Sequence, residues 1–392
     1  VKLTWAWSPH PVGRAQQCQL PPRAWMAALP RRPLGRVLVA GGAGWLGSAL
    51  VGALRRRATE LGVERVVVAD VRARIAALED ALDGAIDVPL ETLQLDVGDP
   101  EAVEAAFVRL QPDTVLNLAA VIDLRPEVDS APSDSVNDNG AGLLLAAAER
   151  HGAGALVHVS TLDAAWARRP DSLRQPRPPG DLQVDSPIAY VRTKARGEAR
   201  AVAAGHGNGR LAIVVLRPSH VFQATGPVLR DPVAGYMRGL PPVRMGDPNV
   251  RMSMVSVNTV VEAVLQAAVK AGALRGRTYA VKDLDANFVT FYQEQVLGRR
   301  LWPLPALPAW LILLAARTAD AWFGAAAVAR RACCPKRSAA KASRGLAPAL
   351  WSLVVSLTER DPMLCFTVEA VRQTLLEFTV DDSEARRDLG PF

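Results

Sequence analysis

A short apolar run that breaks into a glycine-rich turn limits the folds open to this chain more than any other feature. The run is Val37–Ala40 and the turn is Gly41–Gly47, with glycine at every third position and Trp45 and Leu46 just after Gly44. An apolar helix-like stretch follows, and this order is typical of a strand, a tight turn and a helix. Glycines here allow a sharp turn and a close approach of pyrophosphate, while the helix N-terminus offers free N–H groups. The stretch predicts a dinucleotide-binding site, with an ordinary turn as the alternative.

A second apolar run supports the dinucleotide interpretation. Val66–Ala69 ends in Asp70, about 20 residues after the glycines, where an acid accepts hydrogen bonds from an adenosine ribose. A carboxylate at this position repels a 2′-phosphate, so Asp70 favours NAD. Arg72 and Arg74 follow closely and leave NADP open as the alternative.

The third expected strand is Leu93–Val97, which ends in Asp96 and Val97 just before a turn. A carboxylate there lies at the rim of the sheet, where it can bind the amino group of an adenine. In the alternative interpretation, Asp99 caps the next helix and Asp96 is a solvated turn residue.

Small residues follow the fourth expected strand. The run Thr114–Ala120 contains Asn117 and closes on Ala119 and Ala120. Small side chains at this end of a parallel strand let a cofactor backbone lie against the sheet edge. Residues 136–150 then follow a helical pattern.

Hydroxyl, phenol and amine groups converge on one expected site. The strand Ala155–Val159 ends in Ser160 and Thr161, which lie where a substrate is expected or else cap the next turn. Tyr190 and Lys194, four residues apart, share one face of a helix. A free tyrosine has a pKa near 10, and a neighbouring ammonium group lowers it. The pair therefore predicts a tyrosine that takes the proton of an alcohol.

Together these motifs resemble the extended short-chain dehydrogenase/reductase family, and most closely its 3β-hydroxysteroid and sterol dehydrogenase branch. The resemblance runs from residue 36 to about residue 282 and includes Leu216–Pro218. It implies cofactor contacts from Gly41, Gly44, Trp45, Leu46, Gly47, Asp70, Asp96, Val97, Asn117, Ala119, Ala120, Asn137, Tyr190, Lys194 and Pro218.

The resemblance also implies the catalytic roles. Tyr190 would be the base, Lys194 would hold the nicotinamide ribose and lower the tyrosine pKa, and Thr161 or Ser160 would bind the substrate oxygen. Pro218 would touch the nicotinamide end of NAD. The chain departs from the family pattern at His220–Gln223, which lacks the usual glycine after the aromatic residue.

The C-terminal third is apolar and basic. Leu301–Ala316 carries no charge, but it is shorter than the ~20 residues that a spanning helix needs. Residues 301–344 contain three tryptophans, Trp302, Trp310 and Trp322, and a basic run that reaches Arg344. These features favour a helix that lies in the membrane interface. A helical substrate domain with an apolar core and a single span between Arg300 and Arg330 are the alternatives.

Composition limits the kinds of binding partner that the chain can have. The chain of 392 residues has a net charge of +7 and is 49% hydrophobic, so it has ample core. Its basic residues lie beside apolar stretches and lack interleaved aromatics, which favours an anionic membrane surface and excludes nucleic acid. The four cysteines have no spacing typical of a metal site or a disulfide framework, and no metal is expected.

We therefore predict an α/β chain: an NAD(P)-binding, Rossmann-type, doubly wound parallel sheet over residues 36–285, with a smaller, mainly helical C-terminal region over 286–392. Residues 1–35 form a basic leader outside the fold, which is either an organelle-targeting segment or, if translation starts at Met26, only about ten residues long before the first strand. The expected reaction is NAD-dependent oxidation of a 3β-hydroxyl of a steroid or sterol, with or without decarboxylation or isomerisation. A nucleotide-sugar epimerase or dehydratase and a non-catalytic cofactor-fold protein are the alternatives. We expect the protein to associate with the cytoplasmic face of a membrane, which in a eukaryote is that of the endoplasmic reticulum. A homodimer is the expected assembly.

Overall fold

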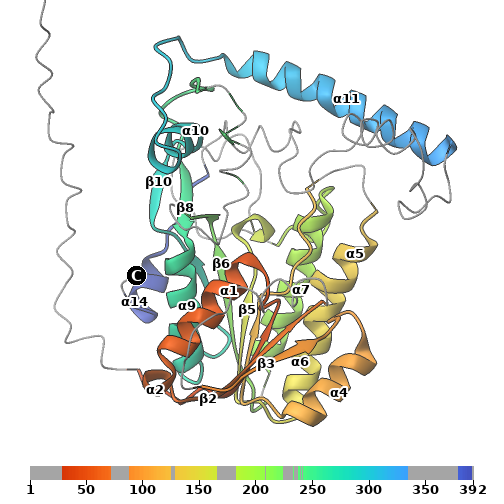
Figure 1. Ribbon diagram of the computed structural model, residues 1–392, viewed down its shortest axis with the longest axis vertical. Helices are drawn as coiled ribbons and strands as arrows, with labels where there is room; N and C mark the ends of the chain where they lie inside the picture. The colour runs from red at the N-terminus through yellow and green to blue at the C-terminus, as the bar shows by residue number, and fades with distance from the viewer. Residues whose placement is uncertain are drawn as a thin grey trace, which may run out of the picture.

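One parallel sheet organises the molecule (Figure 1). The computed structural model describes residues 29–71, 88–124, 129–165, 182–207, 209–223, 233, 237–238, 240, 242–333 and 378–390, with side chains up to 326 in the segment that ends at 333. Within these residues seven strands pair in the order β3-β2-β1-β4-β5-β6-β9, all parallel. The strands are β1 (Gly35–Ala40), β2 (Val63–Asp70), β3 (Leu90–Gln94), β4 (Thr114–Asn117), β5 (Ala155–Val159), β6 (Ala212–Pro218) and β9 (Thr278–Val281).

The strand order reverses at β1, which has β2 on one side and β4 on the other. Ligands of doubly wound sheets bind outside the carboxyl ends of the strands at this reversal. The predicted doubly wound parallel sheet is confirmed, and its reversal lies where the glycine turn leaves β1.

Helices cover both faces of the sheet, as Figure 1 shows. On one face α1 (Trp45–Arg56), the short α2 (Ala58–Leu61) and α9 (Val257–Val269) pack in one apolar cluster with the strands. On the other face α4 (Pro100–Leu110), α6 (Ala141–Arg150) and α7 (Ala189–Gly205) pack in a second cluster. Successive strand residues point to opposite faces, so strands buried on both sides carry continuous apolar runs.

Irregular helical segments lie beside the carboxyl ends of the strands. The helical pattern predicted for residues 136–150 begins earlier, with α5 (Ala131–Ser133), and continues through the π-helix η2 (Asp134–Gly140) into α6. A 3₁₀ turn, η3 (Leu162–Ala165), follows β5. Wide π turns are rare in proteins and often occur near functional sites.

A second, three-stranded sheet lies beyond β6. It contains β7 (His220–Phe222), β8 (Met252–Ser256) and β10 (Leu284–Ala286), followed by α10 (Phe288–Thr290), the π-helix η5 (Phe291–Val296) and the long α11 (Ala309–Cys333). The boundary predicted after residue 285 falls inside β10. The C-terminal α14 (Ser383–Asp388) packs against the main sheet, where the Tyr279 hydroxyl donates to Asp388 over 2.8 Å.

Two boundaries differ from the sequence prediction. The fold begins before residue 36: Leu34 is fully buried and donates its N–H to the Leu61 carbonyl, and Gly35 opens β1. The third strand is Leu90–Gln94 rather than Leu93–Val97, so the carboxylate of Asp96 lies in the turn that follows.

Several sequence predictions lie outside the described residues. These are the leader up to residue 28, Arg72 and Arg74, and the part of the basic run between residues 334 and 344. Among the helices that the structure describes, none combines the length and the apolar character that crossing a membrane requires.

Candidate active site

The glycine turn has the geometry of a phosphate cradle. Gly41 has a φ of 76°, and a Cβ there would lie 2.6 Å from the backbone N of Ala119. A Cβ at Gly47 would lie 2.7 Å from the Cα of Gly42. Gly44 caps α1 without any side chain on the first N–H groups. The turn therefore keeps open the space and the N–H donors that a pyrophosphate needs, which fits a dinucleotide.

Asp70 lies beside this turn, as predicted. Its carboxylate accepts the N–H of Ala43 over 3.1 Å and the N–H of Val71 over 2.8 Å. Trp45, the first residue of α1, donates its indole N–H to Gln223 over 2.7 Å. The turn is thus joined to the segment after β7, in the region where the chain departs from the family pattern.

The residues after β3 divide between two roles. The Asp99 carboxylate caps α4 by accepting the N–H groups of Glu101 and Ala102, which confirms the capping interpretation of this residue. Asp96 is exposed and accepts the N–H of Gly98 over 2.9 Å, while Val97 is buried. Contacts of Asp96 and Val97 with an adenine stay a prediction.

Asn117 stabilises the segment that faces the glycine turn. Its amide oxygen accepts the N–H of Ala119 over 3.1 Å, and its amide nitrogen lies 3.2 Å from Nδ1 of His158 on β5. Because that nitrogen can only donate, Nδ1 of His158 accepts. Burial, aided by the nearby Lys194 charge, holds the pKa of His158 well below its usual value, so this imidazole is neutral. Ala119 and Ala120 are half-buried at the end of β4, as predicted.

Asn137 joins two parts of the site from within η2. Its amide oxygen accepts the N–H of Val121 over 2.9 Å, and its amide nitrogen donates to the Val121 carbonyl and to the Thr193 hydroxyl. The segment after β4 is therefore fixed to α7. A direct contact of Asn137 with the cofactor stays a prediction.

Tyr190 and Thr161 meet at the carboxyl end of β5. Tyr190 lies in the first turn of α7 and is buried, and its phenol is hydrogen-bonded to the Thr161 hydroxyl. The Thr161 hydroxyl oxygen also lies 3.3 Å from the Asp163 carboxylate and accepts the Asp163 N–H. Burial raises the pKa of Tyr190 above its usual value, Asp163 raises it further, and the Thr161 hydrogen bond lowers it. Tyr190 and Lys194 both lie on α7, but the predicted fall of the tyrosine pKa is reversed.

Lys194 has partners that explain this reversal. Its ammonium group is buried and donates to the Val159 carbonyl over 2.6 Å. Burial lowers the pKa of Lys194 to about 8, and the Glu198 charge acts in the opposite direction. The pKa of Tyr190 is therefore raised mainly by burial of the phenol and by the charge of Asp163.

Ser160 does not share the position of Thr161. Its hydroxyl is buried and donates to Glu198 over 2.5 Å, which makes it an anchor of α7. Pro218, the other predicted nicotinamide contact, ends β6 directly after Arg217. The sequence reasoning missed Asp163 and Glu198, although Glu198 repeats the four-residue spacing from Tyr190 to Lys194.

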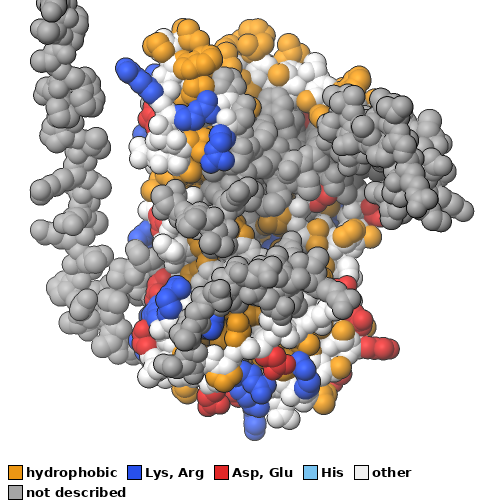
Figure 2. Space-filling model, viewed as in Figure 1, with side chains coloured by type: hydrophobic (Ala, Val, Ile, Leu, Met, Phe, Trp, Pro, Cys, Tyr) orange, Lys and Arg blue, Asp and Glu red, His pale blue; other side chains and the backbone are white. Residues whose placement is uncertain are grey.

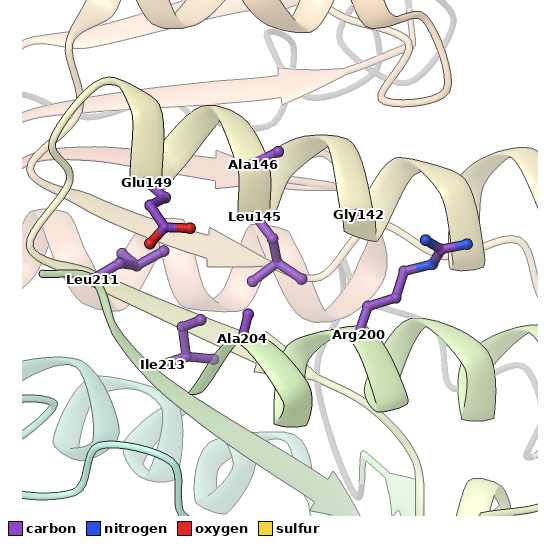
Figure 3. A pocket seen from close by; sticks show the side chains of 8 residues that line it. All are labelled: Gly142, Leu145, Ala146, Glu149, Arg200, Ala204, Leu211 and Ile213. Atoms are coloured by element: carbon purple, nitrogen blue, oxygen red, sulfur yellow. The ribbon is translucent and has the colours of Figure 1, made fainter. Parts of the chain in front are cut away.

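A pocket of about 240 Å³ lies elsewhere, between α6 and α7 (Figure 3). Figure 3 shows Glu149 and Arg200 on its two helices, with Leu211 and Ile213 below Glu149. Residues 211–213 precede or begin β6, so this pocket lies at the opposite edge of the sheet from Thr161. None of the predicted site residues lines it.

The sheet, the glycine cradle and the Thr161–Tyr190–Lys194 group define a Rossmann-type protein of the extended short-chain dehydrogenase/reductase class. The model of the NAD dependent epimerase/dehydratase family matches residues 37–281, and the chain belongs to this family. The family is NAD-dependent, so the predicted cofactor is confirmed.

Relatives and solved structures agree with this assignment. The chain is 31% identical over 190 residues to a dTDP-glucose 4,6-dehydratase of Actinoplanes sp., a match that covers 48% of this chain and 57% of that protein. The UDP-glucose 4-epimerase of Thermus thermophilus, solved with NAD, is 27% identical with a TM-score of 0.51, over 70% of this chain and 86% of that one. The fold of DesIV, a dTDP-glucose 4,6-dehydratase from Streptomyces venezuelae solved as a double mutant with NAD, covers 91% of both chains with a TM-score of 0.58 at 18% identity.

Proposed function

We propose that this chain transfers a hydride between NAD and a secondary alcohol carbon of a cyclic substrate. The carrying observation is the placement of Thr161, directly after β5, and of buried Tyr190 and Lys194, on α7, at the carboxyl edge of the same sheet as the glycine turn. NAD supplies the hydride acceptor when it is bound. The chain then binds and orients both molecules and moves one proton.

Tyr190 handles that proton, and Thr161 holds the substrate oxygen. The raised pKa of Tyr190 keeps the phenol protonated at neutral pH, the form that donates to a carbonyl oxygen. Removal of a proton from an alcohol requires the phenolate, which a positive charge brought beside Tyr190 stabilises. Lys194 lies one turn further along the same helix face, with its ammonium at the end of β5.

Two substrate classes have support. A nucleotide-sugar is favoured by the family and by the dehydratase and epimerase relatives. A steroid or sterol with a 3β-hydroxyl is favoured by a large exposed apolar surface, which a water-soluble sugar diphosphate does not need. That surface comprises Trp302, Leu304, Leu307, Trp310, Leu311 and Leu314, from the segment before α11 and from its first turns.

We propose that this apolar surface lies against an anionic membrane. Trp302 is 48% exposed and Trp310 is 66% exposed, and Figure 2 shows apolar side chains gathered at the end of the molecule that carries α11. Arg300 and Arg317 flank the surface and are exposed, so they can approach anionic headgroups. This proposal keeps the expected membrane localisation and its cytoplasmic face. A homodimer stays a prediction.

A substrate panel tests the function. The purified chain is incubated with NAD and either UDP-glucose, dTDP-glucose or a 3β-hydroxysterol in detergent, and NADH and products are followed by absorbance and mass spectrometry. Turnover of a sugar nucleotide supports the first class, and a 3-ketone with NADH supports the second. Tyr190→Phe should lose activity by roughly 10²–10⁴-fold, the usual contribution of a positioned proton donor or acceptor. Full activity in this variant would refute the mechanism.

Tyr279→Phe is the matched control, because this phenol is bonded to Asp388 at the far side of the sheet from the site. It should keep the wild-type rate.

The membrane proposal is tested by sedimentation with vesicles of anionic or neutral lipid. Trp310→Asp should abolish binding to anionic vesicles, while Val108→Asp on α4, another exposed apolar side chain, should not. Equal binding of all three proteins would contradict the proposal.

A further inference from the structure

A buried carboxylate connects the parts of the site that the sequence places far apart. Glu198 lies on α7 and its side chain has no solvent exposure. It accepts the Ser160 hydroxyl over 2.5 Å and the Arg217 Nε–H over 2.7 Å. Arg217 also forms an ion pair with it through a second guanidinium nitrogen. Ion pairs this deeply buried are costly to form and lose much when one partner is removed.

These bonds fix the carboxyl ends of two neighbouring strands. Ser160 directly follows β5, and Arg217 is the penultimate residue of β6. The next residues are Thr161 and Pro218, which the proposed function places at the reacting end of the site. Glu198 therefore sets the distance from α7 to both strand ends at once.

The same carboxylate faces the ammonium of Lys194. The two residues are four apart on α7, on the face that also carries Tyr190. Lys194 is almost wholly buried, and burial alone favours its neutral form. Glu198 opposes this by favouring the charged form.

The other groups around Lys194 do not supply this negative charge. His158 on β5 is neutral and Arg217 on β6 is positive. In η2, Asn137 is uncharged and Asp138 is paired with Arg200. Asp163 in η3 acts on Tyr190.

We propose that Glu198 is a positioning residue of the active site: it fixes the ends of β5 and β6 to α7 and supplies the buried negative charge that keeps Lys194 protonated for cofactor binding. This inference rests on the proposed function for its effect on NAD, but its effect on the charge of Lys194 holds in the free protein.

The first test measures the unfolding free energy of the free protein against pH. A lysine with a lowered pKa releases its proton in the folded state first, so stability rises with pH from about 8 towards the unfolded-state value. In Glu198→Gln this rise should begin roughly one pH unit lower, because the loss of one nearby opposite charge lowers the pKa of Lys194 by about that much. Lys194→Met should reduce the rise and leave the part that comes from Lys270, whose pKa is also lowered by burial.

The second test measures NAD affinity by calorimetry across the same pH range. Wild-type affinity should fall above about pH 8 as Lys194 loses its proton. In Glu198→Gln that fall should move to lower pH by the same interval, so that NAD binds about two-fold more weakly at pH 7 and about five-fold more weakly at pH 8. Ser160→Ala, which removes one anchor and no charge, should leave the pH of the fall unchanged.

Two further variants separate positioning from general stability. Glu91→Gln is the matched control, because Glu91 is a half-buried carboxylate paired with Arg65 and Arg109 away from the site. It should leave both pH profiles unmoved. Glu198→Gln leaves Arg217 without its counter-charge, so the double variant Glu198→Gln/Arg217→Gln removes both charges and should still show the shifted profiles.

The inference is overturned if Glu198→Gln and its double variant keep the wild-type pH profile of stability, or if Glu91→Gln shifts it equally. Failure of the proposed function has a different signature. In that case no variant, nor the wild type, turns over a substrate, while the free-protein profile still shifts in Glu198→Gln.

Discussion

Gly47→Ala is expected to weaken NAD binding and to destabilise the fold, because the added methyl group has no room. A Cβ at this position would lie 2.7 Å from Cα and 2.8 Å from the carbonyl carbon of Gly42, and would also meet the Gly41 carbonyl oxygen. All three are backbone atoms, which cannot rotate away. α1 must therefore move off the turn, and its N–H groups move away from the phosphates.

The expected magnitude follows from overpacking. An extra methyl group in a closely packed place costs about 1–3 kcal/mol. If binding loses the same free energy, the Kd for NAD rises by roughly five- to 150-fold. Calorimetry with NAD gives the Kd, and denaturant unfolding of the free protein gives the stability.

Gly52→Ala on the same helix is the control. Its Cβ would meet only the guanidinium of Arg56, at 3.1 Å, and that flexible side chain can move. Alanine favours a helix interior over glycine by up to about 1 kcal/mol, so this variant should be as stable as the wild type or more so. A Gly47→Ala protein that binds NAD as tightly as the wild type would refute the steric reasoning.

Three further predictions concern the surroundings of the site. Asp113→Asn should lower stability at neutral pH by up to about 1 kcal/mol, given that the pair with Arg36 is 38% exposed on both sides. The hydrogen bond with Arg36 holds the pKa of Asp113 below its usual value. The stability that this carboxylate contributes is therefore fully present above the pKa it has in the unfolded chain, and it is lost as the pH falls through the pKa it has in the folded protein. Denaturant unfolding curves of the wild type and of Asp113→Asn should converge below about pH 4. Asp99→Ala should cost about 1 kcal/mol through the lost cap of α4, measured in the same way, whereas an unchanged midpoint would contradict the capping role. Trp45→Phe should remove the bond to Gln223 and raise the KM for substrate more than the KM for NAD; equal changes would show that this bond does not reach the substrate side.

Much of the main sheet could be predicted because its strands are buried on both faces. The run Ala155–Val159 coincides with β5, and Val66–Ala69 lies within β2. β3 is an edge strand, and all five of its residues are partly or fully exposed. The apolar pattern instead continues into Leu95 and Val97, which are buried in the turn after the strand.

Site residues could be predicted where local geometry decides their place. The glycine turn, Asp70 and the Tyr190–Lys194 spacing are fixed by a single turn or a single helix. The partners of Glu198 lie 38 and 19 positions away, so their contacts depend on how two strands meet α7. Asp163 reaches Tyr190 only because η3 follows β5 directly, which no pattern in the sequence indicates.

The raised pKa of Tyr190 shows that the spacing of two residues on a helix does not by itself predict the direction of a pKa shift. Helical spacing correctly placed an ammonium and a phenol on one face, but it left out burial and the counter-charges. Lys194 faces the negative charge of Glu198, while Asp163 acts on the phenol. The free site therefore stabilises the neutral phenol, and only an added positive charge at Tyr190 can favour the phenolate. Activation of this tyrosine then depends on what occupies the site, and the residue pair alone does not provide it.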